Sequence, residues 1–123
     1  MSTTNPAQLA EHAAEAIRSF NHATQSGKGE LAYPADAYEA VGSLVMLAQR
    51  LPQGLGQLAR FLEQQGRTGH VTADHGAPEL HLAKARAALG TAALSAQAVT
   101  EFLEQAHNAL APLGWNGPMT DDR

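Results

Sequence analysis

Apolar residues of this 123-residue chain recur every three or four positions in three separate segments. That spacing is helical, because residues three and four apart lie on one face of an α-helix. The first segment predicts a helix over residues 6–25, with Asn5 suited to cap it and Pro6 to occupy its first position. Its apolar stripe consists of Leu9, Ala13, Ala16, Ile17 and Phe20.

The second segment predicts a helix over residues 34–65. Its apolar stripe follows a heptad through Val41, Leu44, Ala48, Leu51, Leu55, Leu58 and Leu62. Pro52 interrupts this stripe, and proline removes a helical hydrogen bond and clashes with the preceding turn. We therefore expect a kink or a break near Pro52. A break would let the segment fold back and form a fourth helix.

The third segment follows a loop over 66–77 and predicts a helix over residues 78–111. Its heptad stripe is Leu82, Ala85, Leu89, Ala92, Ala96, Val99, Leu103, Ala106 and Leu110. Alternating Leu and Ala is typical of closely packed antiparallel helices. The predicted fold class is therefore all-α, a single domain built as an elongated antiparallel hairpin or bundle of three to four helices. The first helix should pack across the hairpin, and residues 118–123 should form a flexible tail.

Composition narrows the possible functions. Hydrophobic residues make up 44% of the chain but aromatic residues only 5%, so the core must be built from Leu and Ala. Because there is no cysteine, disulfides and thiolate chemistry are excluded. The net charge of −4 and the scattered basic residues argue against nucleic-acid binding. With no long apolar run and no signal-peptide pattern, we expect no membrane association and a cytoplasmic location.

His81 and Lys84 lie three residues apart in the small-residue segment ELHLAKARAALG. This His-x-x-Lys resembles the acceptor segment of histidine phosphotransfer domains, which are helical bundles. The resemblance implies that His81 is a phosphoacceptor. In that family a glycine usually follows the lysine, whereas Ala85 stands here. The interpretation favoured by the heptad is that His81 lies at the flank of the packing stripe.

Metal sites and catalytic motifs have little support in the sequence. Glu104 and His107 form one Glu-x-x-His, whereas a di-iron bundle needs two copies and further carboxylates. His70, Asp74 and His75 could approach a zinc ion, but a polar loop explains them as well. No Gly-rich phosphate loop and no Gly-x-Ser-x-Gly occur. We expect no metal, no cofactor and no enzymatic activity.

Trp115 is the only tryptophan, and it follows Gly114, which is suited to end a helix. It can fold back as part of a C-terminal cap or anchor a partner. Trp115-Asn116-Gly117, with the predicted hairpin, resembles the WxG-type helical hairpins of type VII secretion. In that family the motif lies between the two long helices, and a Tyr-x-x-x-Asp/Glu signal is present. Here the motif follows the last helix, and Ala37 stands four residues after Tyr33.

The segment ELAYPADAYEAVGSLVMLAQRLPQGLGQLARFLEQ also resembles small uncharacterised all-helical proteins of high-GC actinobacteria, which implies an accessory role. We therefore predict a non-catalytic interaction module, a scaffold or adaptor, that forms a homodimer or binds another helical protein. The residues predicted to carry packing and interaction are Leu44, Leu51, Leu55, Leu58, Leu82, Leu89, Val99, Leu103 and Trp115. The alternatives are a phosphotransfer protein with His81 as acceptor, and a bundle that binds a metal or small ligand.

Overall fold

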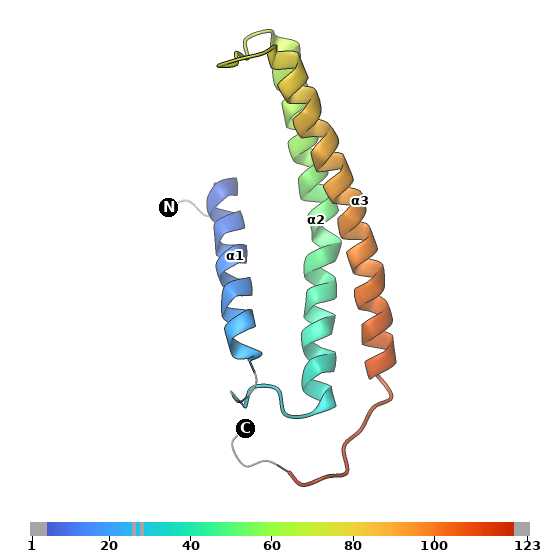
Figure 1. Ribbon diagram of the computed structural model, residues 1–123. Coiled ribbons are helices and arrows are strands. Elements are labelled where there is room, and N and C mark those ends of the chain that lie inside the picture. The colour runs from blue at the N-terminus through green and yellow to red at the C-terminus, as the bar shows by residue number, and fades with distance from the viewer. Residues whose placement is uncertain (1–4, 26, 28, 120–123) are drawn as a thin grey trace. The chain divides into compact units, whose positions relative to one another are not determined.

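The computed structural model describes residues 5–25, 27 and 29–119, and these residues form three α-helices and no strand (Figure 1). Helix α1 spans Pro6–Ala23, α2 spans Pro34–Thr68 and α3 spans Pro78–Leu110. The predicted all-α class is confirmed. Within the described residues there are three helices rather than four.

The chain divides into two compact units. The first unit comprises Met1–Ala37 and Leu113–Arg123, and the second is Tyr38–Pro112. The packing of the first helix across the hairpin stays a prediction. Of the predicted tail, residues 120–123 lie outside the described residues, and Pro118 and Met119 are exposed.

Helix α1 begins where its capping residues predict. The Asn5 side-chain oxygen accepts hydrogen bonds from the backbone N–H groups of Ala7 at 2.9 Å and Gln8 at 3.2 Å. These bonds satisfy two of the donors that the first turn of a helix leaves unpaired. The helix ends at Ala23, two residues earlier than predicted, and the Thr24 N–H bonds back to carbonyls of the last turn.

Helix α2 is one helix through Pro52, so the break anticipated near this residue is absent. An interior proline costs a helix about 3 kcal/mol relative to alanine, an amount that tertiary packing along a long helix can offset. Pro52 is half-buried, so its ring contributes to that packing. The helix extends to Thr68 rather than to residue 65, and the Thr68 hydroxyl donates to the Gln65 carbonyl at 2.7 Å.

Helices α2 and α3 pack side by side as an antiparallel hairpin (Figure 1). At one end, a Cβ built on Gly42 would lie 3.0 Å from Nε2 of His107. At the other end, a Cβ built on Gly66 would lie 3.2 Å from Cδ1 of Leu82. The start of α2 therefore faces the end of α3, and the end of α2 faces the start of α3.

The residues between the two helices, here called the inner stripe, are buried or half-buried and follow a heptad on each helix. On α2 they are Tyr38, Val41, Val45, Ala48, Pro52, Leu55, Ala59 and Leu62. On α3 they are Leu82, Arg86, Leu89, Ala93, Ala96, Thr100, Leu103, His107 and Leu110. Val45, Ala48 and Ala96 are the most buried of the described residues. These small side chains let the two helix backbones approach closely.

The inner stripe differs from the predicted stripe at every second position. The sequence pattern predicted Leu44, Leu51 and Leu58 at these positions. In the structure the next residue in each case lies there instead, namely Val45, Pro52 and Ala59. The displaced residues Leu51 and Leu58, and Val99 on α3, are 46–50% exposed. Leu44 is half-buried at the edge of the stripe. The predicted residues Leu55, Leu82, Leu89 and Leu103 are half-buried within it.

Candidate functional site

One side of the hairpin is apolar. On each helix, the residues that come one position before the inner stripe form a second stripe. On α2 these residues are Leu44, Leu47, Leu51, Gly54, Leu58 and Phe61, and on α3 they are Ala88, Ala92, Ser95, Val99, Phe102 and Ala106. We call these two stripes together the apolar side.

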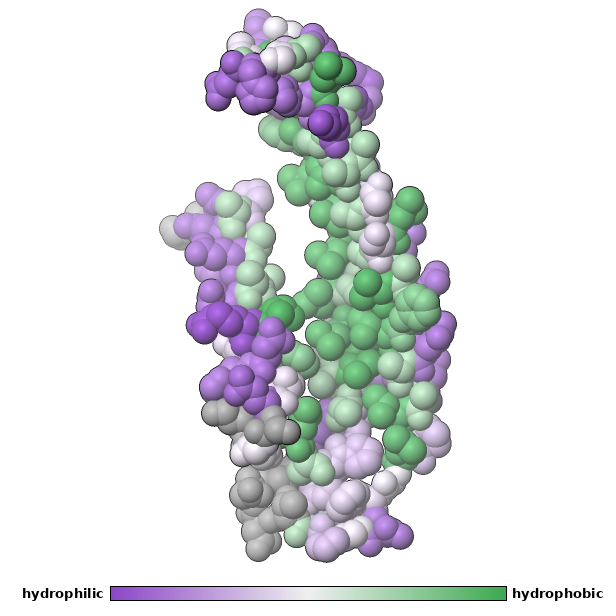
Figure 2. Space-filling view, viewed as in Figure 1, coloured by the Kyte–Doolittle hydropathy of each residue, from purple (hydrophilic) through white to green (hydrophobic). Residues whose placement is uncertain are grey.

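The two stripes lie on the same side because the helices are antiparallel. In an antiparallel pair, residues displaced in the same sequence direction from the contact line turn toward the same side of the pair. Figure 2 shows the result as a continuous hydrophobic surface over α2 and α3. All members of the apolar side are exposed except Leu44, which is half-buried.

The opposite side of the hairpin is mostly polar. It carries the residues one position after the inner stripe, among them Gln49, Gln53, Arg60, Glu63, Gln97, Glu101 and Glu104, with Met46 and Leu94 as large apolar exceptions. The Gln49 amide donates to the Glu104 carboxylate at 3.4 Å, which joins the two helices on this side. The hairpin is therefore amphipathic as a whole.

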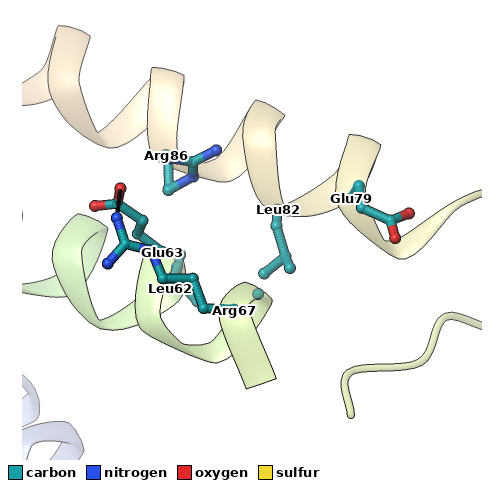
Figure 3. Close-up of a pocket in the computed structure, with 7 residues that line it drawn as sticks. Leu62, Glu63, Arg67, Glu79, Leu82 and Arg86 are labelled. Carbon is teal, nitrogen blue, oxygen red and sulfur yellow. Dashed lines mark hydrogen bonds and ion pairs between the residues drawn. The ribbon is translucent and has the colours of Figure 1, made fainter. Parts of the chain in front are cut away.

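A shallow hollow of about 260 Å³ near the loop end is lined by four charged residues (Figure 3). Arg67 and Glu63 pair there at 3.0 Å, and both side chains are exposed, so the pair contributes little to stability. Arg86 and Glu79 also line the hollow, and the buried Nε of Arg86 has no hydrogen-bond partner among the described residues. Two arginines and two glutamates balance in charge, so the hollow favours neither anions nor cations.

His81 lies near the start of α3, beside the loop that joins the helices. Its ring nitrogen Nε2 donates to the His75 carbonyl at 2.8 Å, because a carbonyl oxygen can only accept. The His75 ring meets the His81 ring edge-on, with 5.2 Å between centroids. Lys84 lines the same surface hollow as these two histidines. The structure thus gives His81 a local structural role. Only its Nδ1 atom keeps a lone pair and could act as a nucleophile.

The predicted metal candidates do not come together. Among the described residues, no three His, Asp or Glu side chains are grouped so that they could hold a metal ion. Glu104 is engaged by Gln49, and His107 stacks on Tyr38 with 4.0 Å between ring centroids. Sequence reasoning missed this ring pair, although Tyr38 and His107 both lie in heptad register with the inner stripe.

Trp115 belongs to the other unit. Its indole N–H donates to the Pro118 carbonyl at 3.0 Å, and its ring meets Tyr33 edge-on at 5.8 Å. A Cβ on Gly117 would lie only 2.8 Å from the Trp115 ring, so the ring must shift to admit any larger residue there. The predicted glycine cap at Gly114 is wrong, because α3 ends with Ala111 in helical conformation and Gly114 has no positive φ.

Within the described residues, no helix has both the length and the hydropathy that crossing a bilayer requires. No family model, no curated protein and no solved structure matches this chain. The exposed apolar side is therefore the feature of the described residues that points to a function.

Proposed function

We propose that this chain is a non-catalytic helical interaction module that self-associates through the apolar side of its hairpin. The observation that supports the proposal is the separation of the two sides. Large apolar residues gather on one side, whereas the other side is mostly polar. A protein surface of this kind is a liability in water unless another molecule covers it.

The size of the apolar side suits a protein interface. Leu47, Leu51, Leu58, Phe61, Val99 and Phe102 are 39–67% exposed. If a large apolar residue exposes roughly 200 Å² when fully accessible, these six present about 600 Å². That value is at the upper end of the largest patch on a typical monomer, and approaches the ~800 Å² that each partner contributes to a standard interface.

A second copy of the chain is the proposed occupant, and a different helical protein is the competing one. Both would bury the same leucines, since a heptad stripe accepts any helix with a complementary stripe. Self-association is favoured because most soluble assemblies are built from identical chains, usually as two-fold dimers.

Light scattering after size-exclusion chromatography, over a range of concentrations, tests the proposal. We expect the wild type to reach the mass of a dimer as concentration rises. Leu51→Glu should shift it to a monomer, because a charge buried in the interface is costly. Met46→Glu is the matched control, since Met46 is 48% exposed on the opposite side of α2 and should leave the dimer intact. A wild type that remains monomeric at every concentration would refute self-association.

A further inference from the structure

The α2 part of the apolar side is a complete heptad seam by itself. Its six residues are spaced alternately three and four apart, as Leu44, Leu47, Leu51, Gly54, Leu58 and Phe61. When a second copy of this seam is placed antiparallel to the first, each seam residue of one copy lies opposite a seam residue of the other. Leu47 then faces Leu58, Leu44 faces Phe61, and Leu51 faces Gly54. An interface between two identical surfaces related by a two-fold axis requires this kind of self-complementarity.

Gly54 favours antiparallel over parallel pairing of two such seams. A Cβ built on Gly54 would meet no described atom within 4 Å, so the space above it is open in the single chain. Glycine weakens a helix interior relative to alanine, so its presence there needs a reason. In an antiparallel pair the side chain of Leu51 fills that space as a knob fills a hole. In a parallel pair Gly54 would face its own copy and leave a cavity, which destabilises packing.

The α3 stripe gives a similar match. Turned end to end, it places Phe102 opposite Ala92 and Val99 opposite Ser95, so that each large residue faces a small one. The midpoint of this match lies at residue 97, and the midpoint of the α2 match lies between residues 52 and 53. Pro52 and Gln97 line the same surface hollow, so the two midpoints lie at nearly the same level of the hairpin.

From these observations we infer that two copies of the chain pair face to face as an antiparallel four-helix bundle. A single two-fold axis crosses the interface at the level of Pro52 and Gln97, with α2 against α2 and α3 against α3 of the second copy. The inference rests on the proposed function and adds the orientation and register of the pairing. Arg50, at the edge of the α2 seam, then faces Gln57 of the second copy, so the two Arg50 charges are kept apart.

Disulfide trapping tests this arrangement cleanly, because the chain has no cysteine of its own. The double variant Leu47→Cys/Leu58→Cys should form a covalent dimer under mild oxidation. The two positions are eleven residues apart, about 16 Å along one helix, too far for a disulfide within the chain. Each single variant should remain monomeric on a denaturing gel, because each position is equally far from its own copy.

A matched control has the same spacing on the polar side of α2. Gln49→Cys/Arg60→Cys should give no covalent dimer, since both positions point away from the second copy. If the double variant at 47 and 58 loses its helical circular dichroism, Arg50→Cys/Gln57→Cys replaces it, because both of these residues are exposed at the edge of the seam.

The outcomes separate the two proposals. Trapping of the folded double variant, without trapping of the single variants, supports the antiparallel register. Trapping of either single variant would show a parallel pair and overturn the inference. A wild type with dimer mass whose double variant is not trapped would keep self-association and discard this register. A monomeric wild type, together with a double variant that is not trapped, would remove both proposals and assign the apolar side to another occupant.

Discussion

Replacing Gly54 with alanine is expected to stabilise the single chain and to weaken its self-association. The glycine lies in the interior of α2, and a Cβ there would meet no described atom within 4 Å. The substitution therefore brings the difference in helix propensity, about 0.8–1.0 kcal/mol, without a clash. For a chain of this size, that gain should raise the melting temperature of the monomer by about 3–6 °C.

In the dimer the same methyl group has the opposite effect. The antiparallel register places Leu51 of the second copy above Gly54, so the added carbon enters occupied space. Overpacking typically costs about 1–3 kcal/mol at a site, and the two-fold axis gives two such sites in each dimer. Because 1.4 kcal/mol corresponds to a factor of ten, the dimer dissociation constant should rise by at least about tenfold.

Two measurements check this pair of effects. Thermal melts followed by circular dichroism, at a concentration where light scattering gives the monomer mass, report the stabilisation. Sedimentation equilibrium reports the dissociation constant. Gly42→Ala is the control, because its Cβ would lie 3.0 Å from His107 Nε2 and the ring must shift to admit it. Equal gains in melting temperature for both variants would refute the α2–α3 register, and an unchanged dissociation constant would refute the contact between Leu51 and Gly54.

Three further substitutions probe other parts of the chain. Ala48→Leu should lower the free energy of unfolding by about 1–3 kcal/mol in urea titrations, because Ala48 is only 3% exposed between the helices; an unchanged midpoint would contradict the close approach there. Gly117→Ala should shift the tryptophan emission of the folded protein, because its Cβ would lie 2.8 Å from the Trp115 ring. Incubation with acetyl phosphate should leave no acid-labile phosphate on the wild type, since the carbonyl and the ring of His75 hold the His81 ring in a structural contact; phosphate that His81→Ala abolishes would establish the phosphotransfer alternative.

The helix starts were predictable from sequence because their causes are local. Pro6, Pro34 and Pro78 each occupy the first position of a helix, where the missing N–H of proline is not needed. Helix ends were less predictable by one to three residues, because the last turn depends on weak contacts such as the Thr68 hydroxyl bond. The continuity of α2 at Pro52 was not predictable, since a local cost competes there with packing along the whole hairpin.

The register of the inner stripe was missed for a different reason. Helix α2 carries two adjacent heptads, and both are apolar. The sequence pattern favours the one with more leucines, because burial of large side chains stabilises most. The structure buries Ala48 as predicted, but it buries Val45 in place of Leu44 and leaves Leu51 and Leu58 exposed on the neighbouring stripe. A single chain provides no signal that chooses between two such stripes, because the choice depends on how closely the second helix can approach.

The large apolar residues that remain exposed on the apolar side have an energetic consequence. The six large exposed residues of the apolar side present about 600 Å², and burial is worth about 25 cal/mol per Å². Leaving that surface in water forgoes about 15 kcal/mol, which equals the upper range of the total stability of a typical domain. A ligand or partner that binds only the folded state adds to its stability in proportion to the logarithm of concentration. If a second copy covers the apolar side, the melting temperature of the wild type must therefore rise with protein concentration, whereas that of Leu51→Glu must not.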